Sequence, residues 1–75
     1  MVFEKVRNMI ATQLQVDPAS ITMESRLVED LKADSANVMV MILEMETEFG
    51  MEVEDEVILQ LKTVGDIYNY ITAHI

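Results

Sequence analysis

The chain has 75 residues and a formal charge of −9, with 14 acidic side chains, five basic side chains and no cysteine. This length predicts one domain, residues 1–75, whose core is too small to enclose a catalytic pocket lined by several positioned groups. The lack of cysteine excludes disulfides and thiolate metal sites, and the negative charge argues against nucleic acid and anionic membranes as partners. Because 51% of the residues are hydrophobic, the chain is too apolar for a disordered acidic tail.

No segment has the pattern of a targeting signal. The longest apolar run, residues 38–43, is six residues long, whereas a secretory hydrophobic region or a membrane span requires more. We therefore expect a cytoplasmic protein. Its small size favours a binding or carrier role, without catalytic residues of its own, in a molecule that is monomeric when free.

The first predicted element is an amphipathic helix of about three to four turns. Its apolar residues recur on one stripe: Phe3, Val6, Ile10 and Leu14. The helix should end before Asp17-Pro18, because the residue that precedes a proline avoids the α region. Residues 17–33 form a long connection, in which Pro18 favours one short turn. This loop should pack over the core because it carries four apolar residues, Ile21, Leu27, Val28 and Leu31.

A second helix is predicted from Ser35 to Phe49, followed by Gly50, where a positive φ favours glycine. Residues 54–61 offer about two further turns, whose predicted buried residues are Val57, Ile58 and Leu61. Thr63 and Asp66 predict a capping box for a last helix, with one apolar face comprising Val64, Ile67, Tyr68, Ile71 and Ile75. The predicted fold is all-α, a small four-helix bundle of three longer helices and one short one, with a long packed loop between the first two.

The second helix carries two apolar stripes, which is more than one contact with a core requires. The first comprises Val38, Met41, Ile42, Met45 and Phe49, and the second comprises Ala36, Met39, Val40 and Leu43. A central helix buried on most sides would explain both. The alternative is that the second stripe is exposed, with Glu46 at its border, and docks partner proteins. Methionine suits such a surface, because its unbranched side chain adapts to different partners.

Asp34 and Ser35 begin this helix, in a stretch from Ala33 to Leu61 that contains eight acids and no base. Leu27-Val28-Glu29-Asp30-Leu31 precedes the pair, and Glu48-Phe49-Gly50 ends the helix. Together with the chain length and the Ile-Tyr-Asn-Tyr-Ile of the last helix, these motifs resemble the acyl carrier protein family over almost the whole chain. The resemblance implies that Ser35 is esterified by 4'-phosphopantetheine donated from coenzyme A. The thiol of this arm would carry acyl groups as thioesters.

The resemblance also implies the partners. These are a phosphopantetheinyl transferase and the acyl-transferring and chain-elongating enzymes of fatty-acid, polyketide or related synthesis, with basic docking patches. The predicted contact residues are Asp34 and Ala36 beside Ser35, and Met39, Val40, Leu43 and Glu46 from the second stripe and its border. An acidic rim would steer basic partners and set their orientation. A phosphodiester on Ser35 would lie beside a helix N-terminus, whose dipole favours an anion.

Four residues depart from the family pattern. Lys32 stands where the family usually has glycine, which should stiffen the approach to Ser35. Ala36 replaces the usual leucine, and acids are common at the positions of Asn37 and Val40. These differences suggest a dedicated carrier that serves one pathway.

The main alternative function is an unmodified acidic adaptor, which would bind a partner through Met39, Val40 and Leu43 while Ser35 only caps the helix. A serine hydrolase is not supported, because the only histidine, His74, is the penultimate residue and no Gly-x-Ser-x-Gly motif is present. The acids from Glu52 to Glu56 match no EF-hand loop, so no specific metal site is predicted.

Overall fold

The structure is a computed structural model that describes residues 2–75. Its helices are α1 (Val2–Leu14), a short 3-10 helix η1 (Pro18–Ser20), α2 (Ser35–Phe49), α3 (Asp55–Ile58) and α4 (Val64–His74). Within the described residues, β structure is limited to one isolated bridge between Arg26 and Thr63. The all-α prediction, with three longer helices and one short one, is confirmed. No helix among residues 2–75 is long and apolar enough to cross a membrane.

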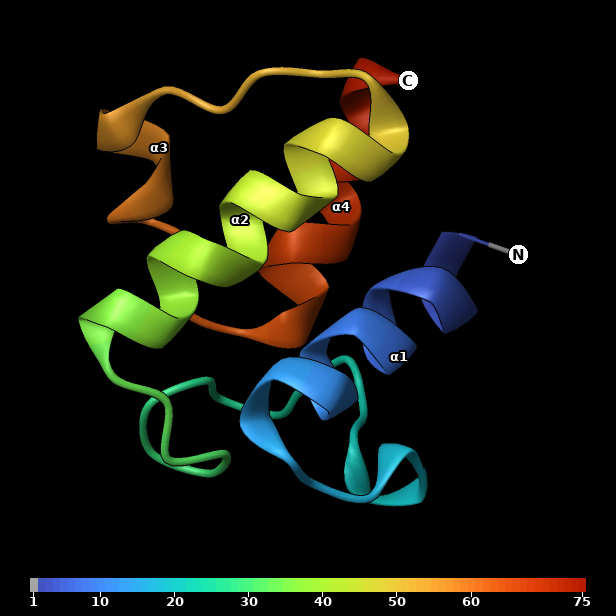
Figure 1. Cartoon of the computed structure of the whole chain (residues 1–75), viewed down its shortest axis with the longest axis vertical. Helices are drawn as coiled ribbons and strands as arrows, with labels where there is room; N and C mark the ends of the chain where they lie inside the picture. The colour runs from blue at the N-terminus through green and yellow to red at the C-terminus, as the bar shows by residue number, and fades with distance from the viewer. Residues whose placement is uncertain (1) are drawn as a thin grey trace.

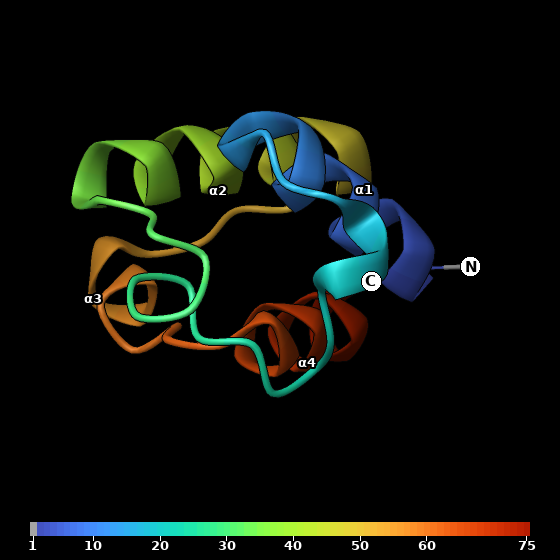
Figure 2. The same ribbon diagram turned by 90° about the horizontal axis from the view of Figure 1, so that it is seen from below.

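The helices enclose one core. α1 and α2 run side by side, and α4 lies beneath them, while α3 and the loop between α1 and α2 close the remaining side (Figures 1 and 2). The largest fully buried side chains come from α1, the loop, α2 and α4: Val6, Ile10, Leu27, Met41, Ile42, Met45, Val64 and Ile67. The stripe predicted for α1 and the first stripe predicted for α2 therefore supply the centre of the molecule.

The boundaries of α2 agree with the sequence prediction. Asp34 adopts an extended conformation as the N-cap, and Gly50 ends the helix with a φ of 64°. The N–H of Gly50 donates to the carbonyl oxygen of Glu46, which satisfies one of the terminal carbonyls of the helix. The capping box of α4 is also confirmed, since Thr63 Oγ1 accepts from the Asp66 N–H at 3.1 Å and Asp66 Oδ2 accepts from the Thr63 N–H at 3.1 Å.

The loop between α1 and α2 packs over the core as predicted, with Ile21, Leu27 and Leu31 buried. The prediction for Val28 was wrong, because its side chain is 60% exposed. The Leu27 N–H donates to the Lys62 carbonyl oxygen at 2.9 Å beside the Arg26–Thr63 bridge. Val28 lies in a turn, residues 27–31, in which the N–H groups of Asp30 and Leu31 donate to the Arg26 carbonyl oxygen at 2.9 and 3.0 Å. Leu27 and Leu31, four residues apart on this turn, both face the core, and Val28 between them faces solvent.

The prediction for residues 54–61 agrees with the structure. α3 is one α-helical turn, and the turn continues to Leu61, because the N–H groups of Gln60 and Leu61 donate to the carbonyl oxygens of Val57 and Ile58 at 2.8 and 3.2 Å. Of the predicted buried set, Leu61 is buried, and Val57 and Ile58 are half-buried against the core. The prediction for Ile75 was wrong. Ile75 is 58% exposed rather than part of the apolar face, since it lies beyond the last turn of α4.

Candidate functional site

Asp34 and Ser35 occupy different positions at the start of α2. Asp34 Oδ1 accepts from the Asn37 N–H at 2.8 Å, and Asn37 Oδ1 accepts from the Asp34 N–H at 3.4 Å. This reciprocal pair is a capping box, so Asp34 satisfies the helix terminus. Ser35 is the first helical residue and is exposed to solvent. The capping role that the adaptor hypothesis gave to Ser35 belongs to Asp34.

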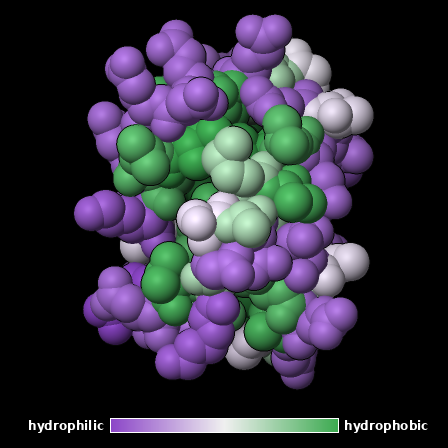
Figure 3. Space-filling view, turned by 60° about the vertical axis from the view of Figure 1, so that its left-hand side comes forward, coloured by the Kyte–Doolittle hydropathy of each residue, from purple (hydrophilic) through white to green (hydrophobic). Residues whose placement is uncertain are grey.

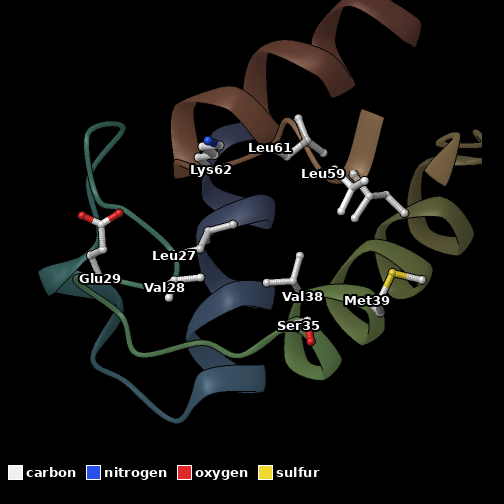
Figure 4. A pocket seen from close by; sticks show the side chains of 10 residues that line it. Leu27, Val28, Glu29, Ser35, Val38, Met39, Leu59, Leu61 and Lys62 are labelled. Atoms are coloured by element: carbon white, nitrogen blue, oxygen red, sulfur yellow. The ribbon is translucent and has the colours of Figure 1, made fainter. Parts of the chain in front are cut away.

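The hydroxyl of Ser35 differs from the other two serine hydroxyls of the chain. Ser20 Oγ donates to the Asp17 carbonyl oxygen at 2.7 Å, and Ser25 Oγ accepts from the Thr22 N–H at 3.0 Å. Ser35 Oγ forms no hydrogen bond with any residue from 2 to 75. Figure 4 shows its oxygen at the start of α2, directed away from Val38. An exposed hydroxyl without an intramolecular partner can be reached by a modifying enzyme.

The turn that leads into Ser35 is held by Arg26. Its backbone N–H donates to the Asp30 carboxylate at 2.9 Å, and its guanidinium contacts both Asp30 at 3.3 Å and Glu29 at 2.6 Å. The backbone hydrogen bond, followed by the guanidinium hydrogen bond and charge, holds the pKa of the Asp30 carboxyl below its usual range. These contacts fix the loop two residues before the left-handed turn at Lys32.

Lys32 has a φ of 62°, a conformation that favours glycine. For other residues it costs about 1–2 kcal/mol. Replacement by glycine removes this cost, but glycine loses more conformational freedom on folding, which reduces the gain in stability by about 0.5–1 kcal/mol. We therefore expect Lys32→Gly to raise the free energy of unfolding by about 0.5–1 kcal/mol, measured by urea denaturation. Lys32→Ala is the control, since it removes the charge and keeps the strain. Equal stability of the two variants would contradict backbone strain at this position.

A cavity of about 370 Å³ opens beside Ser35. Its walls come from the loop, the first turns of α2 and the segment 58–62, as Figure 4 shows. Seven of its lining residues are apolar: Leu27, Val28, Val38, Met39, Ile58, Leu59 and Leu61. Glu29, Ser35 and Lys62 contribute the polar part of the lining. A hydroxyl at the edge of an apolar cavity places a group attached to that hydroxyl within reach of an apolar interior.

The second stripe of α2 is exposed. Met39 and Val40 are each 40% exposed and Leu43 is 57% exposed, while Ala36 lies at the surface. The interpretation of α2 as a helix buried on most sides is therefore wrong. A shallow hollow lined by Met9, Val40, Leu43, Glu44, Thr47 and Glu48 lies along the same side, between α1 and α2.

Glu46 has a structural contact that the sequence did not predict. Its Oε2 accepts from the Val53 N–H at 2.7 Å, which ties the segment between α2 and α3 to the end of α2. The carboxylate is therefore partly engaged within the molecule. The role of Glu46 and of the second stripe in binding partners stays a prediction.

Sequence reasoning missed two residues beside Ser35. It assigned Val28 to the core and gave Leu59 no role, yet both line the cavity and are exposed. A signal was present for Leu59. Val57, Ile58 and Leu59 are three consecutive apolar residues, and a single helical turn cannot direct all three into one core. No group of three metal-ligating side chains is gathered anywhere in residues 2–75.

The sequence and the structure of this chain are similar to those of known proteins. A family model described as a phosphopantetheine attachment site matches residues 4–71. The acyl carrier protein of Clostridium acetobutylicum is 47% identical over 74 residues, which cover 99% of this chain and 96% of that protein. The acyl carrier protein of Thermotoga maritima is 40% identical over 70 residues, covering 93% of this chain and 86% of that protein. The solved structure of the acyl carrier protein from Enterococcus faecalis matches with a TM-score of 0.85 at 35% identity, and covers 99% of this chain and 94% of that chain.

Proposed function

Because the chain belongs to the acyl carrier protein family, we propose that its 4'-phosphopantetheine arm is attached to the hydroxyl of Ser35. The protein carries acyl groups, and the thiol of the arm supplies the thioester chemistry. The observation that carries the assignment to Ser35 is its exposed hydroxyl, which is free of hydrogen bonds to the described residues, while Asp34 caps the helix.

The surroundings of Ser35 suit the attached group. A phosphodiester on the first residue of α2 lies at the positive end of the helix dipole, and the Asp34 capping box holds that end of the helix in place. No described side chain is hydrogen-bonded to the hydroxyl, so its proton must pass to a base on the modifying enzyme. The chain itself contributes position and access, and in our proposal it has no catalytic residue.

The cavity beside Ser35 provides a place for the carried group. We propose that the apolar part of an acyl chain enters between Val38, Leu59 and Leu61 while the thioester is not in use. Burial of apolar surface stabilises such a position by about 25 cal/mol per Å² removed from water. The cavity is open on one side, so an enzyme that binds the carrier can withdraw the chain.

The proposed partners are a phosphopantetheinyl transferase and enzymes that transfer or extend acyl groups. Residues 44–56 contain seven acids and no base, which favours partners with basic docking patches at that end of α2. Contact through Met39, Val40 and Leu43 is part of the same proposal. The cytoplasmic location, the monomeric state and the single domain expected from the sequence remain predictions.

The test is loading of the arm. The purified protein is incubated with coenzyme A and a broad-specificity phosphopantetheinyl transferase, and its intact mass is measured. We expect a gain of one arm per chain and, with an acyl-coenzyme A, a gain of one acylated arm. A chain that stays unmodified with several transferases would favour the unmodified adaptor.

A further inference from the structure

Glu46 holds the segment that joins α2 to α3. The N–H groups of Gly50 and Met51 both donate to its backbone carbonyl oxygen, and the Val53 N–H donates to its side-chain Oε2 at 2.7 Å. The side-chain bond is partly buried, and Val53 packs against the core. Glu46 therefore fixes the chain both at the end of α2 and two residues before α3 begins at Asp55.

α3 has no side-chain cap at its start. Its N-cap residue, Glu54, makes no side-chain hydrogen bond to the helix terminus, and the helix is only four residues long. A single helical turn is not stable by itself in water. The position of α3 therefore depends on the segment that precedes it and on Val57 and Ile58, which are half-buried against the core.

α3 and the residues that follow it form one wall of the cavity beside Ser35. Ile58, Leu59 and Leu61 line this wall, whereas Val38 comes from α2 on the other side of the cavity (Figure 4). The space-filling view of this side of the molecule shows apolar surface in the middle and polar side chains at the margins (Figure 3). Movement of α3 away from α2 would open this apolar space to water.

We propose that Glu46 is a positioning residue for the carried group. Through Val53 it holds the α3 wall against the cavity, and so keeps an acyl chain and its thioester away from water. This role rests on the proposed attachment at Ser35 and on the proposed entry of the acyl chain into the cavity. It requires an acceptor oxygen at position 46 and no charge, whereas a contact with a basic partner would require the charge.

The test measures how fast hydroxylamine removes the acyl group from the loaded protein when no partner enzyme is present. The nitrogen of hydroxylamine attacks the thioester carbonyl, the C–S bond breaks, and a proton from the nitrogen passes to the leaving thiolate of the arm. The acyl group leaves as a hydroxamic acid, so the intact mass of the protein reports the reaction.

Glu46→Ala loaded with an octanoyl group should react about fivefold faster than the wild type, because a hydrogen bond of ordinary strength no longer opposes local opening of the wall. Glu46→Gln keeps an acceptor oxygen for the Val53 N–H and removes the charge. Its octanoyl-loaded form should react within about twofold of the wild type.

Two controls separate this role from a general loss of stability. Asp17→Ala also removes a carboxylate that accepts from a backbone N–H, that of Ala19 at 2.9 Å. Asp17 caps η1, which lies on the opposite side of the molecule from α3 (Figures 1 and 2), so its octanoyl-loaded form should react like the wild type. Acetyl-loaded proteins should react at the same rate in all variants, because an acetyl group has almost no apolar chain to place in the cavity.

Hydrogen exchange of the unloaded protein gives a second readout that does not depend on the arm. The Val57 and Ile58 N–H groups, which donate to the Glu54 carbonyl oxygen, should exchange about fivefold faster in Glu46→Ala but not in Glu46→Gln. Unchanged exchange in Glu46→Ala would show that Glu46 does not hold α3, and would overturn the positioning role.

The octanoyl rates can overturn the role in three further ways. Glu46→Ala could react like the wild type, Asp17→Ala could react as fast as Glu46→Ala, or Glu46→Gln could react as fast as Glu46→Ala. Equal rates for octanoyl and acetyl groups in the wild type would overturn the entry of the acyl chain into the cavity. A wild type that takes up no arm would overturn the attachment at Ser35, and hydrogen exchange would still decide whether Glu46 holds α3.

Discussion

Ser35→Ala is expected to abolish the uptake of phosphopantetheine completely, because alanine has no hydroxyl that can form the phosphodiester. Ser35 Oγ makes no hydrogen bond with the described residues and the side chain is exposed, so its loss should leave the fold unchanged. Substitutions of exposed residues that make no such contacts usually change the free energy of unfolding by less than about 0.5 kcal/mol. The intact mass after incubation with coenzyme A and transferase measures the effect.

Ser20→Ala is the matched control for this prediction. Ser20 is an exposed serine as well, but its hydroxyl donates to the Asp17 carbonyl oxygen within η1. The Ser20→Ala protein should gain the full mass of the arm. A Ser35→Ala protein that is still modified, or a Ser20→Ala protein that is not, would show that the arm is attached elsewhere.

Gly65→Ala should be strongly destabilising, although alanine is ordinarily the better helix former by about 1 kcal/mol. A Cβ atom at position 65 would lie 2.8 Å from the carbonyl oxygen of Met23. The Gly65 N–H donates to the same oxygen at 2.8 Å, so the two backbones cannot separate without breaking this bond. We expect a loss of about 1–3 kcal/mol in the free energy of unfolding, a large part of the roughly 3–5 kcal/mol expected from a core of this size.

Asn69→Ala provides the comparison in the same helix. Asn69 is exposed, so its replacement should be neutral or slightly stabilising because of the helix propensity of alanine. Urea denaturation of the two variants gives the difference directly. If Gly65→Ala were as stable as Asn69→Ala, the close approach of the loop to α4 would not hold in solution. The loop between α1 and α2, which leads to Ser35, would then be held less firmly against α4.

The helices that could be predicted from the sequence are those with local signals at both ends. Asp34 and Gly50 bracket α2, and Thr63 with Asp66 begins α4, because caps act through backbone groups within four residues. Residues 54–61 carry weaker signals, since Glu54 makes no side-chain cap hydrogen bond at the start of α3. Beyond Ile58 the hydrogen bonds follow the 3-10 pattern, so the turns of this segment could be predicted but the end of its α-helix could not.

The candidate site, too, could be predicted only where local sequence signals determine it. Ser35 could be located by its place at a helix start, but Asp34 and Ser35 are both good capping residues, and only the structure shows that Asp34 takes this role. The cavity joins three segments distant in sequence. Val28 was assigned to the core because an apolar residue in a packed loop is usually buried. The turn 27–31, which directs Leu27 and Leu31 inward and Val28 outward, has no glycine or proline that would reveal it in the sequence.

The position of the arm can be measured directly by peptide mapping of the loaded protein. Trypsin cleaves after Lys32 and Lys62, and the resulting peptide 33–62 contains Ser35 as its only serine, whereas Ser20 and Ser25 lie in the peptide 8–26. We predict that fragmentation mass spectrometry finds the phosphopantetheine on the peptide 33–62 and localises it to Ser35. An arm found on the peptide 8–26, or on Thr47 within the peptide 33–62, would contradict the account.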